Sequence, residues 1–434
     1  MGIMKDTKTR KIVRHVILLI LALTSIVLSW VIWTNPARYE RAKQVSSEKV
    51  QSNQVNRDKG DVILPTQVIY TKGEQQELIN NSKSSLPKAA VKEISSWKLS
   101  NITRVSRGNK ERFLDYATLS HSLMLKYPSN ITGKIFNSIY DQKLNTNAEI
   151  SQIVVNVNKP NEFFLLNDAT YDVYQAKASK QDLKQLRKLI KQSDSQYKVK
   201  ETIMNHNLIN DYQTAIKVPY YSFSVNKESS SVFTANLLTN TDADSIDTKK
   251  TKDGTEYVSN DTTKRLLIKN NGFVTFNNAS KANDTEESLK RNLELSFYQM
   301  KQLGVQVDNM RYFNFHENNH EIEFRDFVEG FPIFNADGLD TIKVAHQAKQ
   351  TTTSFSIYNL DVPVPTSKSD KELPSTQDML DELKYSGINT DKIEDIDIGY
   401  ERPSTTKANS TVELEPTWFI KYHGDWTSYR DLVS

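Results

Sequence analysis

The sequence predicts an α+β fold, with an N-terminal single transmembrane helix followed by a multidomain extracellular body of antiparallel sheets with packed helices. Three observations predict it. An uncharged apolar run spans residues 16–33, short β-rich segments separated by turn residues fill much of the remainder, and amphipathic helical segments interrupt those strands. At roughly 100–200 residues per domain, a chain of 434 residues fits two to four compact units.

The apolar run, VILLILALTSIVLSWVIW at 16–33, is close to the length at which an α-helix crosses about 30 Å of hydrocarbon. Basic residues gather in the tail at 1–15, so the positive-inside rule predicts a cytoplasmic tail and an extracellular body. Trp30 and Trp33 then lie at the outer membrane interface, which favours amphipathic rings. The alternative is a cleaved secretory signal, but its apolar core is usually about 7–15 residues. We therefore expect an uncleaved anchor.

One face of this helix carries the small residues Ala22, Ser25 and Ser29. Small side chains at this spacing let two membrane helices approach closely, and hydroxyl groups can bond across the contact. Serine is also tolerated in any membrane helix, because its hydroxyl can bond to the preceding turn. We keep both interpretations and treat the face as a hypothetical partner-binding surface.

The first part of the body follows a polar stalk at 34–60 and is predicted as an α+β domain at 61–205. Strands are expected near 67–70 and, as a meander, at 152–157, 162–166 and 171–175, with turn residues between them. Ser179 and Asp182 precede a helix whose apolar stripe is formed by four residues, Leu183, Leu186, Leu189 and Ile190.

The remainder is predicted as a central β-rich domain at 206–282 and a C-terminal α+β domain at 283–434. Turns at 252–254 and 270–272 each place a glycine where a positive φ is expected. Two helices are expected in the last domain. One is capped by Asp284 and ends at Gly304, and the other runs from Ser375 to Gly387. Strands follow each helix, which makes two helix-on-sheet units.

Composition excludes several classes of function. The 13 glycines are too widely spaced for a Gly-rich phosphate loop, and the absence of cysteine excludes thiol catalysis and Cys-ligated metals. The net charge of +3 arises in the N-terminal tail, so it is no nucleic-acid footprint. We expect no cofactor and no bound metal.

Two patterns resemble catalytic sites. His316 to His320 reads HENNH, which matches the zinc-protease signature, but that chemistry needs both histidines on one helix face. The flanks alternate with period two, so we expect a hairpin tip instead, and the other histidines, His121, His206, His346 and His423, are expected to be solvated or structural. Asp395 and Asp397 lie on one face of a predicted strand. They could form an acid/base pair, but we expect ordinary surface carboxylates, and so no enzyme.

Several strings together resemble one protein family. They are LSWVIWTNP at 28–36, the segments 231–238, 254–258 and 266–268, IEFRDFVEGFPIF at 322–334, and LEPTW at 414–418. In order along the chain they resemble the YycH family of Gram-positive bacteria. Read physically, the strings are mainly structural: Gly330 permits a tight backbone, and the last string is expected to be an edge strand that buries Trp418. The two C-terminal units are also similar to PepSY-like modules.

The resemblance implies a non-enzymatic, membrane-anchored accessory protein of the WalK/WalR (YycG/YycF) two-component system. Such proteins act on the sensor kinase in the cell membrane together with a YycI-type partner, and so influence cell-wall metabolism. Whether the chain activates or inhibits the kinase stays open. The alternative is an extracytoplasmic module that binds cell-wall fragments or peptides.

Overall fold

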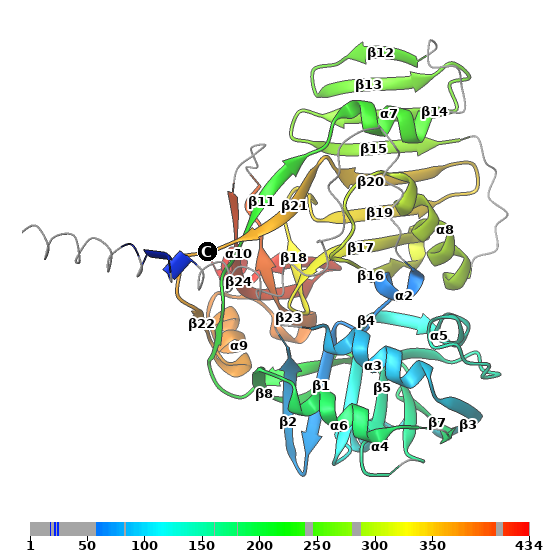
Figure 1. The fold of residues 1–434 in the computed structure, drawn as a ribbon, viewed down its shortest axis with the longest axis vertical. Coiled ribbons are helices and arrows are strands. Elements are labelled where there is room, and N and C mark those ends of the chain that lie inside the picture. The colour runs from blue at the N-terminus through cyan, green and yellow to red at the C-terminus, as the bar shows by residue number, and fades with distance from the viewer. Residues whose placement is uncertain are drawn as a thin grey trace, which may run out of the picture. The chain divides into compact units, whose positions relative to one another are not determined.

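Two large β-sheets form the body of the protein (Figure 1). The computed structural model describes residues 18, 21, 22, 24, 25, 58–81, 84–159, 161–179, 181–238, 246–279, 288–404 and 411–433. The chain divides into two compact units, 1–48 with 82–84 and 49–81 with 85–434, and all that follows on the sheets concerns the second. The fold is α+β with antiparallel sheets, as predicted.

The first sheet, called here the N-terminal sheet, contains nine described strands. Their spatial order is β3 (Lys98–Ser106), β7 (Asp172–Ser179), β6 (Phe163–Asn167), β5 (Glu149–Asn156), β4 (Ser122–Thr132), β1 (Gln67–Lys72), β2 (Gln75–Asn80), β8 (Ser195–Met204) and β9 (Asn207–Tyr212). The predicted meander is confirmed as β5, β6 and β7, which pair in sequence.

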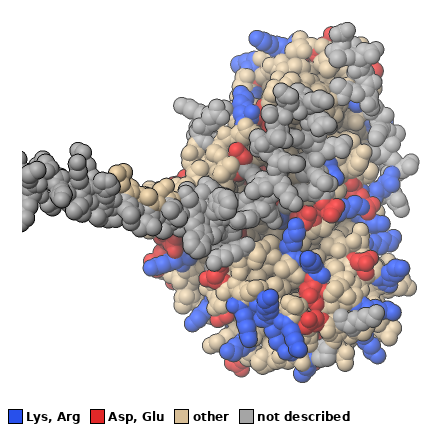
Figure 2. All heavy atoms as spheres, in the orientation of Figure 1, with Lys and Arg blue, Asp and Glu red and all other residues tan. Residues whose placement is uncertain are grey.

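Helices cover both faces of this sheet, which explains why residues on both sides of its central strands β5 and β6 are buried. α3 (Leu86–Ser95) and α6 (Leu183–Lys191) pack on one face, and α4 (Lys110–Ala117) packs on the other (Figure 1). Successive side chains of a strand point to opposite faces. In β5, for example, Val155 joins the core under α3 while Val154 joins the core under α4. The polar sides of α3 and α6 stay exposed, and basic side chains gather over α6 in Figure 2.

The second sheet, called here the large sheet, contains fourteen described strands. Twelve follow the order β12 (Ile246–Lys250), β13 (Gly254–Ser259), β14 (Lys264–Lys269), β15 (Phe273–Asn278), β20 (Thr351–Ser356), β19 (Thr341–His346), β17 (Glu321–Val328), β18 (Phe331–Phe334), β23 (Ile393–Glu401), β24 (Thr411–Tyr422), β11 (Tyr221–Lys227) and β21 (Tyr358–Val364). β16 (Met310–His316) pairs with β17, and β25 (Asp425–Ser428) pairs with β24. A short separate ladder joins β10 (Ile216–Val218) to β22 (Lys371–Leu373).

The remaining helices lie against these sheets. α8 (Leu289–Gln302) packs Leu293, Phe297 and Met300 into the core beside β17 and β19. α9 (Thr376–Tyr385) buries Met379 and Leu383. The shorter elements are α2 (Lys59–Val62), α5 (Gly133–Ile139), α7 (Ser230–Leu238), α10 (Tyr429–Val433) and the single turns η3 (Glu317–Asn319) and η4 (Thr390–Lys392).

Strand pairing crosses both domain boundaries that the sequence suggested. β9 lies beyond residue 205 and still pairs with β8 in the N-terminal sheet. β15 from the range 206–282 pairs along its full length with β20 from the range 283–434, so the strands of these two ranges share one sheet. β8 and β9 form a local hairpin, with Met204 opposite Asn207, whereas the sequence carries no signal for the pairing of β15 with β20, whose partners lie about 80 residues apart (Phe273 opposite Ser356).

Local end signals are largely confirmed, with two corrections. α9 begins after Ser375 and ends before Gly387, and Gly304 follows α8 at φ +77°. The cap of α6 is Asp182 alone, because Ser179 belongs to β7. The cap of α8 is Ser288, and the expected cap Asp284 lies outside the described residues.

The glycines of the two predicted turns serve different purposes. Gly272 has the expected positive φ of +89°. Gly254 does not, and is needed instead for a close approach: a Cβ there would lie 2.1 Å from the Ile268 carbonyl oxygen.

Candidate functional site

The predicted membrane helix is only partly described. Ala22 and Ser25 are helical and exposed, and the hydroxyl of neighbouring Thr24 donates to the Leu21 carbonyl 3.0 Å away. Ser29, Trp30 and Trp33 lie outside the described residues, as does most of the range 16–33. Within the part that is described, no helix reaches the length and apolarity of a membrane span.

The HENNH segment forms a hairpin tip, as predicted. His316 ends β16, Glu317–Asn319 make the turn η3, and His320 adopts a left-handed conformation at φ +50° before β17 begins. His316 Nε2 lies 3.5 Å from Glu323 in β17, an acid that is also paired with Arg325. Across the described ranges, no group of three His, Asp or Glu residues is arranged to hold a metal ion.

The other histidines are structural or turn residues, as expected. His121, His206 and His423 have φ between +55° and +71°, the left-handed conformation of tight turns. His346 is buried, and its Nε2 lies 2.8 Å from Ser296 Oγ. Burial lowers the pKa of His346 to about 4, so its imidazole is neutral at pH 7.

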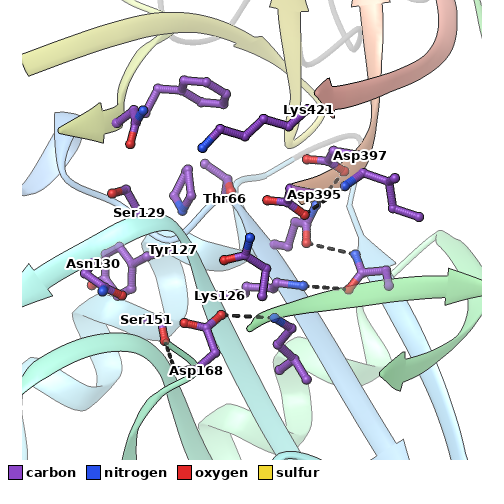
Figure 3. Close-up of a pocket in the computed structure, with 18 of the residues that line it drawn as sticks. Thr66, Lys126, Tyr127, Ser129, Asn130, Ser151, Asp168, Asp395, Asp397 and Lys421 are labelled. Carbon is purple, nitrogen blue, oxygen red and sulfur yellow. Dashed lines mark hydrogen bonds between the residues drawn. The ribbon is translucent and has the colours of Figure 1, made fainter. Parts of the chain in front are cut away.

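Asp395 and Asp397 occupy a different environment from the one predicted. Both project from β23 into a cavity of about 180 Å³ between the N-terminal sheet and the large sheet, and are therefore not ordinary surface carboxylates (Figure 3). We call this cavity the inter-sheet pocket. Its charged lining consists of Lys126 from β4, Asp168 from the turn after β6, Asp395, Asp397, and Lys421 from β24.

A chain of hydrogen bonds crosses the inter-sheet pocket. Lys126 Nζ donates to Asn210 Oδ1 at 3.2 Å, and Asn210 Nδ2 donates to Gln67 Oε1 at 2.9 Å. Gln67 Nε2 in turn donates to Asp397 Oδ1 at 3.4 Å. A lysine of the N-terminal sheet is thereby linked to an aspartate of the large sheet through two amides.

A fourth carboxylate lies behind Lys126. Glu201 of β8 is buried, and its Oε2 is 3.7 Å from Lys126 Nζ; neither carboxylate oxygen has a closer hydrogen-bond donor. Asp168, by contrast, accepts hydrogen bonds from Gln152 Nε2 at 3.0 Å and from the Leu208 amide at 3.1 Å. The carboxylate of Asp168 is therefore stabilised by two hydrogen bonds, whereas the carboxylate of Glu201 is stabilised mainly by the charge of Lys126.

Burial makes three of these acids unusually weak. Loss of hydration raises the pKa of Glu201 from 4.5 to about 7, although Lys126 opposes the shift. Burial, together with the charge of Asp395, raises the pKa of Asp397 to about 7. Burial raises the pKa of Asp395 to about 6 against the opposing effect of Lys126. The pocket therefore binds protons near neutral pH, which ordinary surface carboxylates do not.

Sequence reasoning found only part of this site. The spacing of Asp395 and Asp397 was noticed, but Lys126, Asp168 and Glu201 were not. A signal for Lys126 existed, because it is the only charge in the apolar run SLMLKY of β4. Nothing in the sequence relates these residues to Asp397, which follows Lys126 by more than 250 positions.

The comparisons with known proteins agree with this architecture. The model of the YycH protein N-terminal domain matches residues 11–195, and that of the YycH protein C-terminal domain matches residues 204–432. The chain belongs to the YycH family. The two matches adjoin β8, the strand that carries Glu201.

A solved structure shares the fold. The crystal structure of YycH from Bacillus subtilis is similar at a TM-score of 0.69 and 14% identity, over 86% of this chain and 97% of that one. An uncharacterized protein from Eubacterium rectale shares 14% identity over 52% of this chain, but its TM-score of 0.32 supports no argument. No curated protein matches the chain. The chain is therefore a YycH-type accessory protein. Its family is a regulatory accessory family and not a known enzyme family.

Proposed function

We propose that this chain is a non-enzymatic regulator of a WalK (YycG) type sensor histidine kinase. It acts through protein–protein contacts, together with a YycI-type partner, and so influences cell-wall metabolism. The observation that carries the proposal is the pair of YycH domain matches, which between them span nearly all of residues 11–432. The family implies an accessory role in a two-component system.

Two contact zones fit this role. The first is the helix at 16–33, placed in the cell membrane with a cytoplasmic N-terminus, whose face of Ala22, Ser25 and Ser29 contacts another membrane helix. Trp30 and Trp33 fix its depth at the outer interface. The second is the extracellular body. A regulator shifts a kinase between states only by binding one state better, and about 1–3 kcal/mol of preference changes activity several-fold or more.

The test is crosslinking in the native membrane followed by identification of the partners. The full chain is compared with a variant that carries Ser25→Leu and Ser29→Leu. A matched control enlarges Val27 and Val31 to leucine, on the opposite side of an ideal helix. We expect the kinase to be recovered with the native chain and the control, and its recovery to fall several-fold with the serine variant.

Other outcomes redirect or reject the proposal. Recovery that survives the serine changes, and also survives replacement of the whole helix, assigns recognition to the body. Absence of any kinase from every sample rejects the regulator function.

The second candidate is a binding module for cell-wall fragments or peptides, and the inter-sheet pocket is the observation that favours it. Its size argues against it, because about 180 Å³ is below the roughly 300–1,000 Å³ of typical small-molecule sites. Titration of the full chain with muropeptides released by muramidase digestion tests this candidate. Saturable heat that Asp397→Asn abolishes would support it, and absence of heat would reject it.

A further inference from the structure

The charges of the inter-sheet pocket do not balance. Three carboxylates, Asp168, Asp395 and Asp397, line it together with two lysines, and a fourth, Glu201, lies behind Lys126. Of the two lysines, Lys421 also lies 3.8 Å from Glu394, a carboxylate that is not one of these four. Lys126 is thus the principal cation for acids that belong to both sheets.

We propose that the inter-sheet pocket is a proton-sensitive joint: protonation of its carboxylates holds β23 against β8 and β9, and ionisation loosens that packing. This adds a response to pH to the proposed function but does not rest on it.

Beyond the pocket, buried apolar side chains of β8, β9 and β23 pack in one hydrophobic cluster, and polar contacts lie at its margin. The turn between β8 and β9 reaches the start of β23, where Asn205 Nδ2 donates to the Ile393 carbonyl and Asn207 Nδ2 donates to the Glu394 carbonyl at 2.9 Å. Trp418 packs edge-on against Tyr212 of β9 at 5.5 Å. The polar chain from Lys126 to Asp397 also crosses this contact, so the charge state of the pocket acts on groups that belong to the interface itself.

Every charged or titratable group that faces the joint bears on the direction of the effect. Those groups are Lys126 and Tyr127 of β4, Asp168 after β6, Tyr197 and Glu201 of β8, His206 in the turn between β8 and β9, Tyr212 of β9, Glu394, Asp395 and Asp397 of β23, and Lys421 of β24. Tyr212 is buried, and its pKa is raised further by the aspartate charge, so it stays neutral. Between pH 5 and 8 the carboxylates whose pKa values are raised change charge.

The sign follows from proton uptake. In the closed joint the pKa values of Glu201 and Asp397 are about 7, and in an open joint water would return them toward their usual values near 4. The closed form therefore holds more protons between these limits, and raising the pH favours opening. For one such group, the opening equilibrium rises on the order of twentyfold between pH 5.5 and pH 7.5.

Hydrogen exchange of the full chain in detergent micelles, followed by mass spectrometry, tests the joint. Exchange is measured at pH 5.5 and 7.5 and corrected for the intrinsic rate at each pH. Peptides from β23 and from β8–β9 report on the joint, and peptides from β5 serve as the internal reference. We expect protection at the joint to fall roughly twentyfold at the higher pH, while β5 stays unchanged.

Two substitutions and a control test whether the pH dependence of protection arises from the carboxylates of the joint or from the protein as a whole. Glu201→Gln and Asp397→Asn, made singly and together, keep side-chain shape but cannot ionise, so the pH effect should shrink with each. Asp391→Asn removes an exposed carboxylate just before β23 and should leave the effect intact.

Two outcomes would overturn the inference. One is wild-type protection that is equal at both pH values. The other is a pH effect that is equal in the wild type and in every folded carboxylate variant.

Discussion

Arg325 is a buried cation whose replacement should strongly destabilise the large sheet. Its guanidinium lies against the rings of Phe313 and Phe334, at 4.7 and 4.3 Å from their centroids. It pairs with Glu323 and donates to the Ile333 carbonyl at 2.9 Å. This side chain therefore holds β16, β17 and β18 together at one point.

The cost of losing it can be worked out from these contacts. In Arg325→Met, Glu323 stays buried, with Lys343 and His316 each 3.5 Å away as its remaining partners. Breaking a buried pair in this way costs about 3–5 kcal/mol. Arg325→Lys keeps the charge but loses the planar guanidinium and much of its stacking on the rings. This should lower the free energy of unfolding by about 2 kcal/mol. Lys343 is 38% exposed, so Lys343→Met should cost less than about 1 kcal/mol.

Urea unfolding of the full chain, followed by far-UV circular dichroism, gives the midpoints for this series. Removing both charges in Arg325→Met with Glu323→Leu should restore part of the loss, because Glu323 is then no longer a buried charge without its arginine, while the buried Asp340 keeps Arg402 as its partner. Both cations contact the same acid. The reasoning is refuted if the free energies of unfolding of Arg325→Met and Lys343→Met differ by less than about 1 kcal/mol.

Three further outcomes follow from the same structure. Gly330→Ala should cost about 2 kcal/mol or more, because Gly330 has φ +83° and a Cβ would lie 2.7 Å from the Thr66 carbonyl oxygen. Gly73→Ala, with φ +63° and open space, should cost only about 1 kcal/mol, and equal thermal midpoints for the two would contradict this. Trp418→Phe should lower stability by about 2–3 kcal/mol in urea, through a lost hydrogen bond to a backbone carbonyl and the void left by the smaller ring; an unchanged midpoint would count against it. Burial would raise the pKa of Glu323, but Arg325 and its other partners outweigh it and lower the pKa to about 2. The difference in free energy of unfolding between the wild type and Glu323→Gln should therefore be full above pH 4.5 and shrink as the pH falls toward 2. A difference that is independent of pH would contradict this reasoning.

The family string at 322–334 shows how local pattern and tertiary role combine. Its alternation predicts strands, and both β17 and β18 form there. Arg325, Phe331 and Phe334 are all buried, which supports the mainly structural interpretation. The position of Trp418 was predicted only in part: it is buried, but β24 lies inside the sheet between β23 and β11 and is not an edge strand.

The segment 110–132 contains two periods in close succession. Leu114 and Tyr116 belong to α4, which ends at Ala117, whereas Leu123 and Leu125 belong to β4, which begins at Ser122. A window that spans both elements mixes periods of 3.6 and 2, so neither dominates. Each element is regular once its limits are known.

The sequence by itself determined what depends on neighbours along the chain. Helix caps such as Ser375, the hairpin tip at His316 to His320, and the meander of β5 to β7 all follow from residues within a few positions of one another. Tertiary structure alone decided which strands share a sheet and what surrounds Asp397. From the alternation of a strand alone, a carboxylate such as Asp397 is expected to face water. In the folded protein a second sheet, from a distant part of the chain, covers it and removes its hydration. The properties of the inter-sheet pocket, including its affinity for protons, arise from that covering.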